Sequence, residues 1–192
     1  ITGILGIWML GTYLNHHAAI LGLGSLLSYA FLYTPLKRFT SFAVIVGAFP
    51  GAIPPLLGWV AATGQYSAVA GILFLFQFIW QFPHFWAIAW VLDDDYKKAG
   101  YRLLPFKQGR SKSTAMLIVL SSLLLIPLSF IPYFIGMSGI VSLVIITLSS
   151  IALTIMAIRL LKSLSIKDAK SLMFASIIYN PLVLIVLLLD KI

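Results

Sequence analysis

Three consecutive carboxylates, Asp93, Asp94 and Asp95, are the side chains in this sequence best suited to chemistry. Adjacent carboxylates repel one another unless a cation holds them, and hard divalent ions such as Mg²⁺ prefer such oxygens. The run follows a long apolar segment, so we expect it at a helix C-terminus, where the helix dipole disfavours negative charge. A solvated helix end balanced by Lys97 and Lys98 is an equally good interpretation, and spacing alone leaves both open.

Lys37 and Arg38 form a second charged site, directly after Tyr33-Thr34-Pro35-Leu36. Basic residues at a membrane edge usually serve as topological anchors, and taken alone the pair favours that interpretation. If the pair faces the acidic run, however, cations opposite metal-bound carboxylates would suit a diphosphate, which carries several negative charges.

Gln77, Gln81 and His84 occupy positions i, i+4 and i+7 of a predicted helix and therefore share one face. A single buried histidine is more often a satisfied core residue than a ligand. Three polar side chains at membrane depth are costlier, which favours a cavity lining. If the helix continues, the same stripe reaches Asp95 about 16 Å beyond His84, which would join a mid-membrane pocket to the charged surface.

A Gly/Pro-rich segment runs from Gly47 to Pro55 within another apolar stretch. Prolines remove backbone donors and kink helices, and a membrane tolerates this only where neighbours or a cavity satisfy the freed carbonyls. The segment therefore predicts either a tightly packed kink or direct contact with a ligand.

The composition requires that these side chains be positioned by membrane-spanning helices. Of the 192 residues 61% are apolar and 9% are charged, whereas a soluble domain carries about a quarter charged residues. The net charge of +8 does not indicate nucleic-acid binding, because the basic residues flank apolar runs. The absence of cysteine excludes disulfides and thiolate metal sites. No signal-peptide pattern precedes the first apolar run, and with Ile1 in place of Met we expect the chain to begin inside a larger protein.

A bilayer core needs roughly 20 apolar residues per helix. The expected spans are one short run and six full-length runs: Ile1–Leu14, then Ala18–Tyr33, Phe42–Thr63, Ser67–Val91, Thr114–Phe134, Gly139–Leu161 and Ser171–Leu189. Continuous runs do not show the period-two alternation of a closed β-barrel. The sequence thus predicts an all-α polytopic bundle of about seven spans in one domain, residues 1–192.

The distribution of Lys and Arg tests this count independently. Basic and neutral connections alternate strictly, and only Lys191 lies on the neutral side. By the positive-inside rule the first span then starts on the cytoplasmic side, or the matrix side in a mitochondrion. The one long connection, Leu92–Ser113, contains the acidic run together with basic residues that include Lys107, and we expect an ordered cap there.

Four blocks of residues resemble the haem O synthase (protohaem IX farnesyltransferase) family of the UbiA superfamily of intramembrane prenyltransferases. In chain order they are Tyr33–Arg38, Gly47–Trp59, Trp80–Phe85 and Asp94–Gly100 followed by Leu103-Leu104-Pro105. Together they are specific, and Gln81-Phe82-Pro83-His84-Phe85 separates haem O synthases from other members of the superfamily.

The resemblance implies a nine-helix fold around a central cavity, of which the seven spans would be helices three to nine. Asp93–Asp95 would be the second of two Asp-rich motifs. The first motif, an Asn followed by spaced Asp residues, is absent from this sequence. We therefore expect either a fragment of an active enzyme or a truncated, inactive protein.

The resemblance also implies a reaction: farnesyl diphosphate, haem B and water give haem O and diphosphate. Haem B would be a substrate and not a prosthetic group. Mg²⁺ held by Asp93, Asp94 and Asp95 would neutralise the departing diphosphate. The catalytic residues would be Asp94, Asp95, Lys37 and Arg38, and the substrate-binding residues Tyr33, Gln77, Gln81, His84, Tyr96, Lys97 and Lys98. His84 would contact the haem iron or a propionate.

The expected environment is a bacterial cytoplasmic membrane, with the mitochondrial inner membrane as the alternative. Haem A synthase or oxidase assembly proteins are expected protein partners, and nucleic acid is not. Two other functions stay open: a prenyltransferase acting on a quinone precursor, and a transporter using the kinked helix and the polar stripe. Transporters often show internal pseudo-symmetry, which is not visible here.

Overall fold

A computed structural model describes residues 1–106 and 108–192 of the chain; Lys107, counted above among the basic loop residues, lies outside the described residues. The described residues form helices joined by mostly short connections, the longer one between α6 and α7, with one isolated β-bridge between Ser138 and Lys191. The expected polytopic all-α bundle is confirmed.

The helices follow the predicted apolar runs closely. Their bounds are α1 Thr2–Met9, α2 His16–Leu27, α3 Thr34–Leu36, α4 Ala43–Thr63, α5 Ala68–Val91, α6 Asp93–Lys98, α7 Lys112–Phe134, α8 Ile140–Ser163 and α9 Ile166–Leu189. Two π-helical stretches, Leu10–Leu14 and Ser28–Tyr33, continue α1 and join α2 to α3. In the part of the chain that is described, six helices are long and apolar enough to cross a membrane, and Thr2–Leu14 is shorter. The protein is a multi-pass membrane protein.

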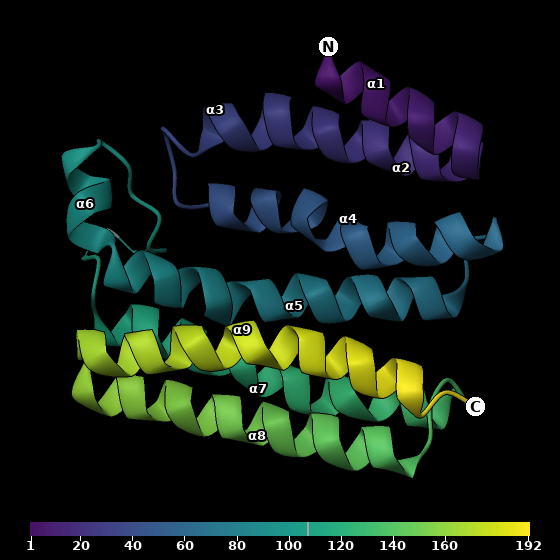
Figure 1. Ribbon diagram of the computed structural model, residues 1–192. Helices are drawn as coiled ribbons and strands as arrows, with labels where there is room; N and C mark the ends of the chain where they lie inside the picture. The colour runs from purple at the N-terminus through teal and green to yellow at the C-terminus, as the bar shows by residue number, and fades with distance from the viewer. Residues whose placement is uncertain (107) are drawn as a thin grey trace.

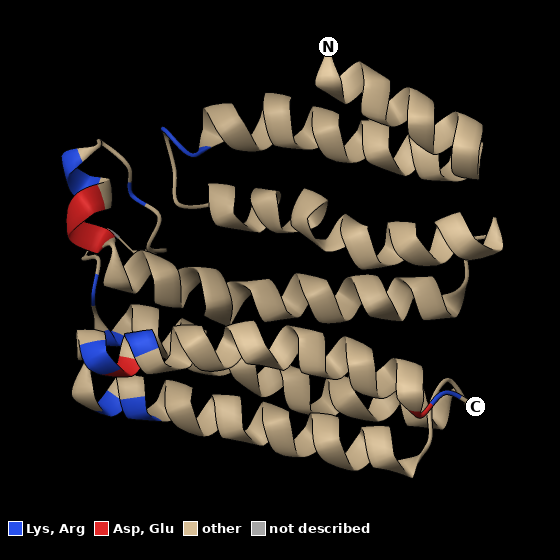
Figure 2. Ribbon diagram, in the orientation of Figure 1, with Lys and Arg blue, Asp and Glu red and all other residues tan. Residues whose placement is uncertain are grey.

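The long helices lie side by side, with the α1–α2 hairpin at one edge and α7, α8 and α9 at the other (Figure 1). Figure 2 shows that nearly all charged residues gather at one end of the bundle, where α3, α6 and the start of α9 lie. Asp190 and Lys191 follow α9 at the opposite end. The predicted alternation of basic and neutral connections is confirmed, because the basic ones all lie at one end.

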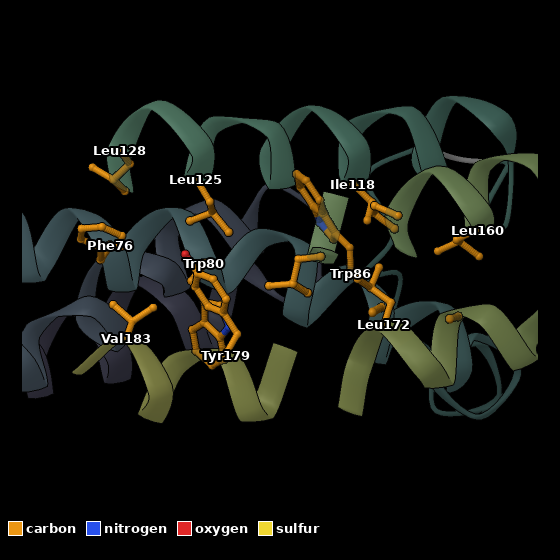
Figure 3. Close-up of a cluster of buried hydrophobic side chains, with 14 of the residues drawn as sticks. Phe76, Trp80, Trp86, Ile118, Leu125, Leu128, Leu160, Leu172, Tyr179 and Val183 are labelled. Carbon is orange, nitrogen blue, oxygen red and sulfur yellow. The ribbon is translucent and has the colours of Figure 1, made fainter. Parts of the chain in front are cut away.

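The core is built by α5, α7, α8 and α9, whose bulky side chains interlock (Figure 3). Trp90, Ile118 and Leu172 are fully buried there. Trp80 also belongs to this cluster, and its indole Nε1 donates to the Ser176 carbonyl of α9 across 2.7 Å. Helix α5 is thus held on one side by α7 and α9, which leaves its other side for α4.

The condition for the polar stripe to reach Asp95, a helix α5 that continues into the acidic run, is not met. Leu92, with φ −98° and ψ 12°, ends α5, and Asp93, Asp94 and Asp95 form the first turn of the separate helix α6. Negative charge in a first turn is stabilised by the helix dipole, not opposed by it. The polar stripe of α5 therefore ends with α5 and does not extend in register to Asp95.

Candidate functional site

A cavity of about 320 Å³ lies between the α2–α3 segment, α4 and α5, and it is closed at the charged end by α6 and the residues after it. Gln81 lines it at membrane depth and Tyr96 of α6 lines it near the charged end. Its lining consists of Tyr29, Tyr33, Val44, Gly47, Gly51, Gln81, Phe85, Ile88, Ala89, Tyr96 and Leu103. The cavity thus joins an apolar, mid-membrane region to the helix that carries the acidic run.

Two glycines of α4 shape this cavity by allowing close approach. A Cβ on Gly47 would lie 2.6 Å from the Tyr33 ring, and one on Gly51 would collide with the Gln81 side-chain oxygen Oε1. The Gln81 amide Nε2 donates to the Ala48 carbonyl across 3.0 Å. The Gly47–Pro55 segment therefore packs tightly, and two of its glycines line the cavity. Direct contact with a ligand, the other interpretation, stays a prediction.

The π-helical stretch Ser28–Tyr33 aims two tyrosines at the cavity. The Tyr29 carbonyl accepts from both the N–H and the hydroxyl of Thr34, five residues later, which is the wider spacing of a π-helical turn. The wider turn places the rings of Tyr29 and Tyr33 5.1 Å apart, and both line the cavity. Such π-stretches occur frequently at functional sites.

Lys37 lies at the charged end of this cavity. Its Nζ is 5.6 Å from the ring centroid of Tyr33 and 5.9 Å from that of Tyr101, within the range of cation–π attraction. Arg38 is exposed in the turn after α3. Lys37 therefore brings positive charge to a residue that lines the cavity.

The three carboxylates of the acidic run pair with three different cations. Asp93 is bonded to Lys97 across 2.6 Å, with 8% of its side chain exposed. Asp94 is bonded to Arg110 across 3.0 Å, and Asp95 lies 3.6 Å from Lys98. No cluster of three acidic or histidine side chains poised for a metal occurs within residues 1–106 and 108–192.

Asp94 and Asp95 nevertheless fit half of a Mg²⁺ site. Their side chains are exposed and adjacent on α6. Mg²⁺ is commonly bound by one or two carboxylates together with waters and substrate phosphates. Asp93 does not fit this role, because its carboxylate is buried against Lys97.

Arg110 is a residue that the sequence analysis did not single out. Its Nε donates to the Trp90 carbonyl across 2.7 Å and its Nη2 to the Val91 carbonyl across 3.2 Å. These are among the last carbonyls of α5, which lack helical partners. Since the same guanidinium bonds Asp94, it ties the end of α5 to α6. The one sequence signal for Arg110 is its place in the long, mixed-charge connection between Leu92 and Ser113.

The polar stripe of α5 divides between two sides. Gln81 lines the cavity, but His84 turns toward α9, where its Nδ1 lies 2.8 Å from the Ser176 Oγ and its ring stacks on Trp80 at 4.6 Å. The Gln77 Oε1 is buried and has no hydrogen-bond partner in the described part of the structure. The structure therefore does not bring all three side chains into one lining.

Residues 1–178 match the family model described as the UbiA prenyltransferase family. This chain belongs to that family. It is 53% identical over 189 residues to the protoheme IX farnesyltransferase of Cytophaga hutchinsonii, covering 98% of this chain and 66% of the relative. It is 47% identical to that of Flavobacterium psychrophilum, covering all of this chain and 63% of the relative. The protoheme IX farnesyltransferase of Solibacter usitatus is 39% identical, again over all of this chain and 64% of the relative.

Membership of the family predicted from the four blocks is thus confirmed. The chain spans between 60% and 66% of the lengths of the first three curated relatives that it matches. No solved structure matches this chain. Members of a prenyltransferase family need a place for a diphosphate and for an apolar chain, and the cavity described above has a charged end and an apolar end.

Proposed function

We propose that the protein to which this chain belongs transfers a farnesyl group from farnesyl diphosphate to a vinyl group of protohaem IX (haem B), giving haem O and diphosphate. One observation supports this most: the cavity joins Gln81 at membrane depth to α6 and Lys37 at the charged end. The similarity to curated protoheme IX farnesyltransferases supports the choice of substrates.

The diphosphate would lie at the charged end of the cavity. Asp94 and Asp95 would hold Mg²⁺, which when bound neutralises negative charge on the diphosphate. Lys37 and Arg38 would add positive charge, and the hydroxyls of Tyr33 and Tyr96, which line the cavity, would donate to phosphate oxygens. Lys98, exposed on α6, can also approach the diphosphate, whereas Lys97 is committed to Asp93.

The apolar part of the cavity suits the bond-making step. The allylic carbon–oxygen bond breaks with its electron pair leaving on the diphosphate, and the resulting cation is attacked by the vinyl π electrons of haem. Water then adds to the new cation next to the porphyrin ring and loses a proton, which gives a hydroxyethylfarnesyl group. Val44, Phe85 and Ile88 keep water away from the first cation.

Haem would bind against the other part of the polar stripe. The His84 Nδ1 is engaged by Ser176, so its Nε2 is the nitrogen left for the haem iron or a propionate. Gln77, whose buried Oε1 has unused hydrogen-bonding capacity, lies two helical turns away and would serve a polar group of the same substrate. Haem is a substrate in this proposal and leaves as haem O.

The cellular setting belongs to the same proposal. Residues 1–192 would form one integral-membrane domain in a bacterial cytoplasmic membrane, with the mitochondrial inner membrane as the alternative. Haem A synthase or oxidase assembly proteins would receive the product.

The test is a prenyl-transfer assay with the purified full-length protein in lipid, Mg²⁺ and farnesyl diphosphate. Haem B and 4-hydroxybenzoate are offered separately, and we expect haem O from the first and no product from the second. Asp95→Asn should abolish turnover, while Asp168→Asn, the same charge change at the start of α9, should retain it. Product from 4-hydroxybenzoate alone would replace the proposal with a quinone-type prenyltransferase, and full function in Asp95→Asn would favour a transporter.

A further inference from the structure

A hollow of about 730 Å³ lies between the start of α7 and the end of α8, at the charged end of the bundle. We call it the α7–α8 hollow. It shares no lining residue with the cavity of the candidate site. Lys112, Ser113 and Met116 line it from α7, and Leu161 and Lys162 line it from α8. The hollow thus combines one lysine from each of two neighbouring helices with a hydroxyl and an apolar floor.

Neither lysine of the hollow forms an ion pair with a carboxylate in the described part of the structure. The chain has five carboxylate side chains, and the three of the acidic run pair with other cations. Asp190 lies at the opposite end of the bundle. Asp168 accepts hydrogen bonds from the hydroxyls of Ser163 and Ser165 at the start of α9. The positive charge of the hollow is therefore not neutralised by the described residues.

Both lysines lie at the depth expected for lipid phosphates. Helices α7 and α8 have 23 and 24 residues. At the rise of an α-helix each is about 35 Å long, slightly more than the roughly 30 Å of the hydrocarbon core. Lys112 is the first residue of α7, where the helix dipole disfavours a cation, and Lys162 is the last residue but one of α8. An anion in the hollow would offset the unfavourable position of Lys112.

A row of exposed apolar side chains continues from each lysine into the membrane. On α7, Met116 and Leu123 lie four and eleven residues after the lysine and are 46% and 48% exposed. On α8, Ile158 and Ile155 lie four and seven residues before the lysine and are 37% and 47% exposed. These spacings keep each row within about 40° of its lysine around the helix axis. The surface therefore presents charge at headgroup depth and apolar contacts below it.

From this arrangement we infer that the α7–α8 hollow binds an anionic phospholipid. Its phosphate lies between the ammonium groups of Lys112 and Lys162, and its acyl chains follow the two apolar rows. The Ser113 hydroxyl, which is exposed in the hollow, donates to a phosphate oxygen. Basic pockets between membrane helices on the cytoplasmic side suit acidic headgroups in this way. The apolar rows favour a lipid over a free anion, which would not contact them. The inference does not depend on the proposed function.

Ser113→Glu tests the hollow while both lysines stay in place. The new carboxylate stands beside the two ammonium groups and repels the lipid phosphate. The variant should fold, because the position is exposed and an acidic residue in a first turn is favoured by the helix dipole. Ser113→Gln is the matched control, with a side chain of the same size and no charge.

A second pair of variants tests the lysines themselves. Lys112→Gln with Lys162→Gln removes both charges of the hollow. Lys167→Gln with Lys170→Gln removes two exposed lysines of α9 at the same end of the bundle, and neither of these lines the hollow. The two double variants have the same net charge, so a difference between them reports on position.

The experiment titrates the full-length protein in a non-ionic detergent with dioleoylphosphatidylglycerol or dioleoylphosphatidylcholine and counts bound lipid by native mass spectrometry. We expect the wild type to prefer the anionic lipid. A lysine near an anionic headgroup contributes about fivefold in affinity, so the Lys112 and Lys162 double variant should bind phosphatidylglycerol about 25-fold more weakly. Ser113→Glu should also lose the preference, whereas Ser113→Gln and the Lys167 and Lys170 double variant should keep it.

Three results would overturn the inference. An equal loss in the Lys167 and Lys170 double variant would make the lysines topological anchors that act through overall surface charge. A preference kept by Ser113→Glu would place the lipid elsewhere. Displacement of the lipid by millimolar inorganic phosphate would make the hollow a site for free anions. Thermal unfolding of each variant without added lipid checks the fold, and Ser113→Glu decides the question if the lysine variant is unstable.

Discussion

The Arg110 guanidinium donates a hydrogen bond from Nη1 to the Asp94 Oδ2 across 3.0 Å, and at the same time it bonds the last carbonyls of α5. The arginine is 22% exposed and the aspartate 66% exposed. Asp94 therefore has an arginine on one side and solvent on the other, which leaves room for a cation there. The contact joins the end of α5 to α6, the helix that carries Tyr96 of the cavity lining.

Removing the guanidinium should loosen α6. In Arg110→Gln the α5 carbonyls and Asp94 lose their hydrogen bonds from the charged guanidinium. Each such bond is worth about 1.5–3 kcal/mol when buried, and less here because the Arg110 and Asp94 side chains are partly exposed. We expect trypsin to cleave after Lys98 about tenfold faster than in the wild type, because cleavage requires local opening. Arg110→Lys should lie in between, since an ammonium cannot reproduce the planar fork. Arg159→Gln, a control at the same end of the bundle, should leave the rate unchanged; equal rates in all variants would show that Arg110 does not hold α6.

Adding one methyl group at Gly51 should displace the Gln81 side chain from the cavity lining. The new Cβ of Gly51→Ala occupies the place of the Gln81 Oε1, so the bond between Gln81 and the Ala48 carbonyl is lost at a cost of about 1–3 kcal/mol. A Cβ added at Gly71 on α5 meets nothing within 4 Å. Gly71→Ala should therefore raise the free energy of unfolding by about 0.5–1 kcal/mol, the usual gain of alanine over glycine in a helix. Thermal unfolding in detergent measures both. A Gly51→Ala protein as stable as Gly71→Ala would argue against close packing of Gln81 on α4.

Asp93 and Asp94 should differ in role. Asp93→Asn removes a buried partner of Lys97, and since the lysine is half exposed we expect a loss near the low end of 1.5–3 kcal/mol in unfolding free energy. Its metal requirement should stay close to that of the wild type. Asp94→Asn should instead raise the Mg²⁺ concentration needed for half-maximal turnover, with a smaller effect on stability. Unfolding curves and metal titrations of both variants measure these effects. A higher Mg²⁺ requirement in Asp93→Asn together with a larger stability loss in Asp94→Asn would contradict the assignment.

The Ser176 hydroxyl should act through His84. If the His84 Nε2 contacts haem, the bond from Nδ1 to Ser176 orients the ring, and partners of this kind typically change affinity 10–100-fold. We expect Ser176→Ala to weaken ferric haem binding about tenfold and His84→Ala to weaken it further, both read from the haem absorption spectrum during titration. Ser150→Ala, which removes another buried hydroxyl bonded to Tyr179, is the control. Unchanged haem spectra and affinity in His84→Ala would remove His84 from the substrate site.

The helices were predictable from the sequence because a membrane helix satisfies its backbone bonds within its own segment. The runs Phe42–Thr63 and Ser67–Val91 correspond to α4 and α5 within one residue at each end. The arrangement of basic residues at one end of the bundle followed from the alternation of connections, which is also a property of short segments. The Gly/Pro segment of α4 predicted a kink for the same reason, because each proline lacks its own backbone N–H whatever its neighbours are.

The site itself depended on contacts between distant residues. Helix α5 ends where the apolar run Ser67–Val91 ends, but no local pattern predicted that Arg110, twenty residues beyond Trp90, takes the free carbonyls there. His84 leaves the cavity side because Ser176, far along the chain, offers its ring a hydrogen-bond partner. Gly47 and Gly51 became cavity residues only when Tyr33 and Gln81 packed against them. Local hydropathy therefore determined which segments cross the membrane, whereas side-chain packing between segments decided which polar groups meet and which hollows remain.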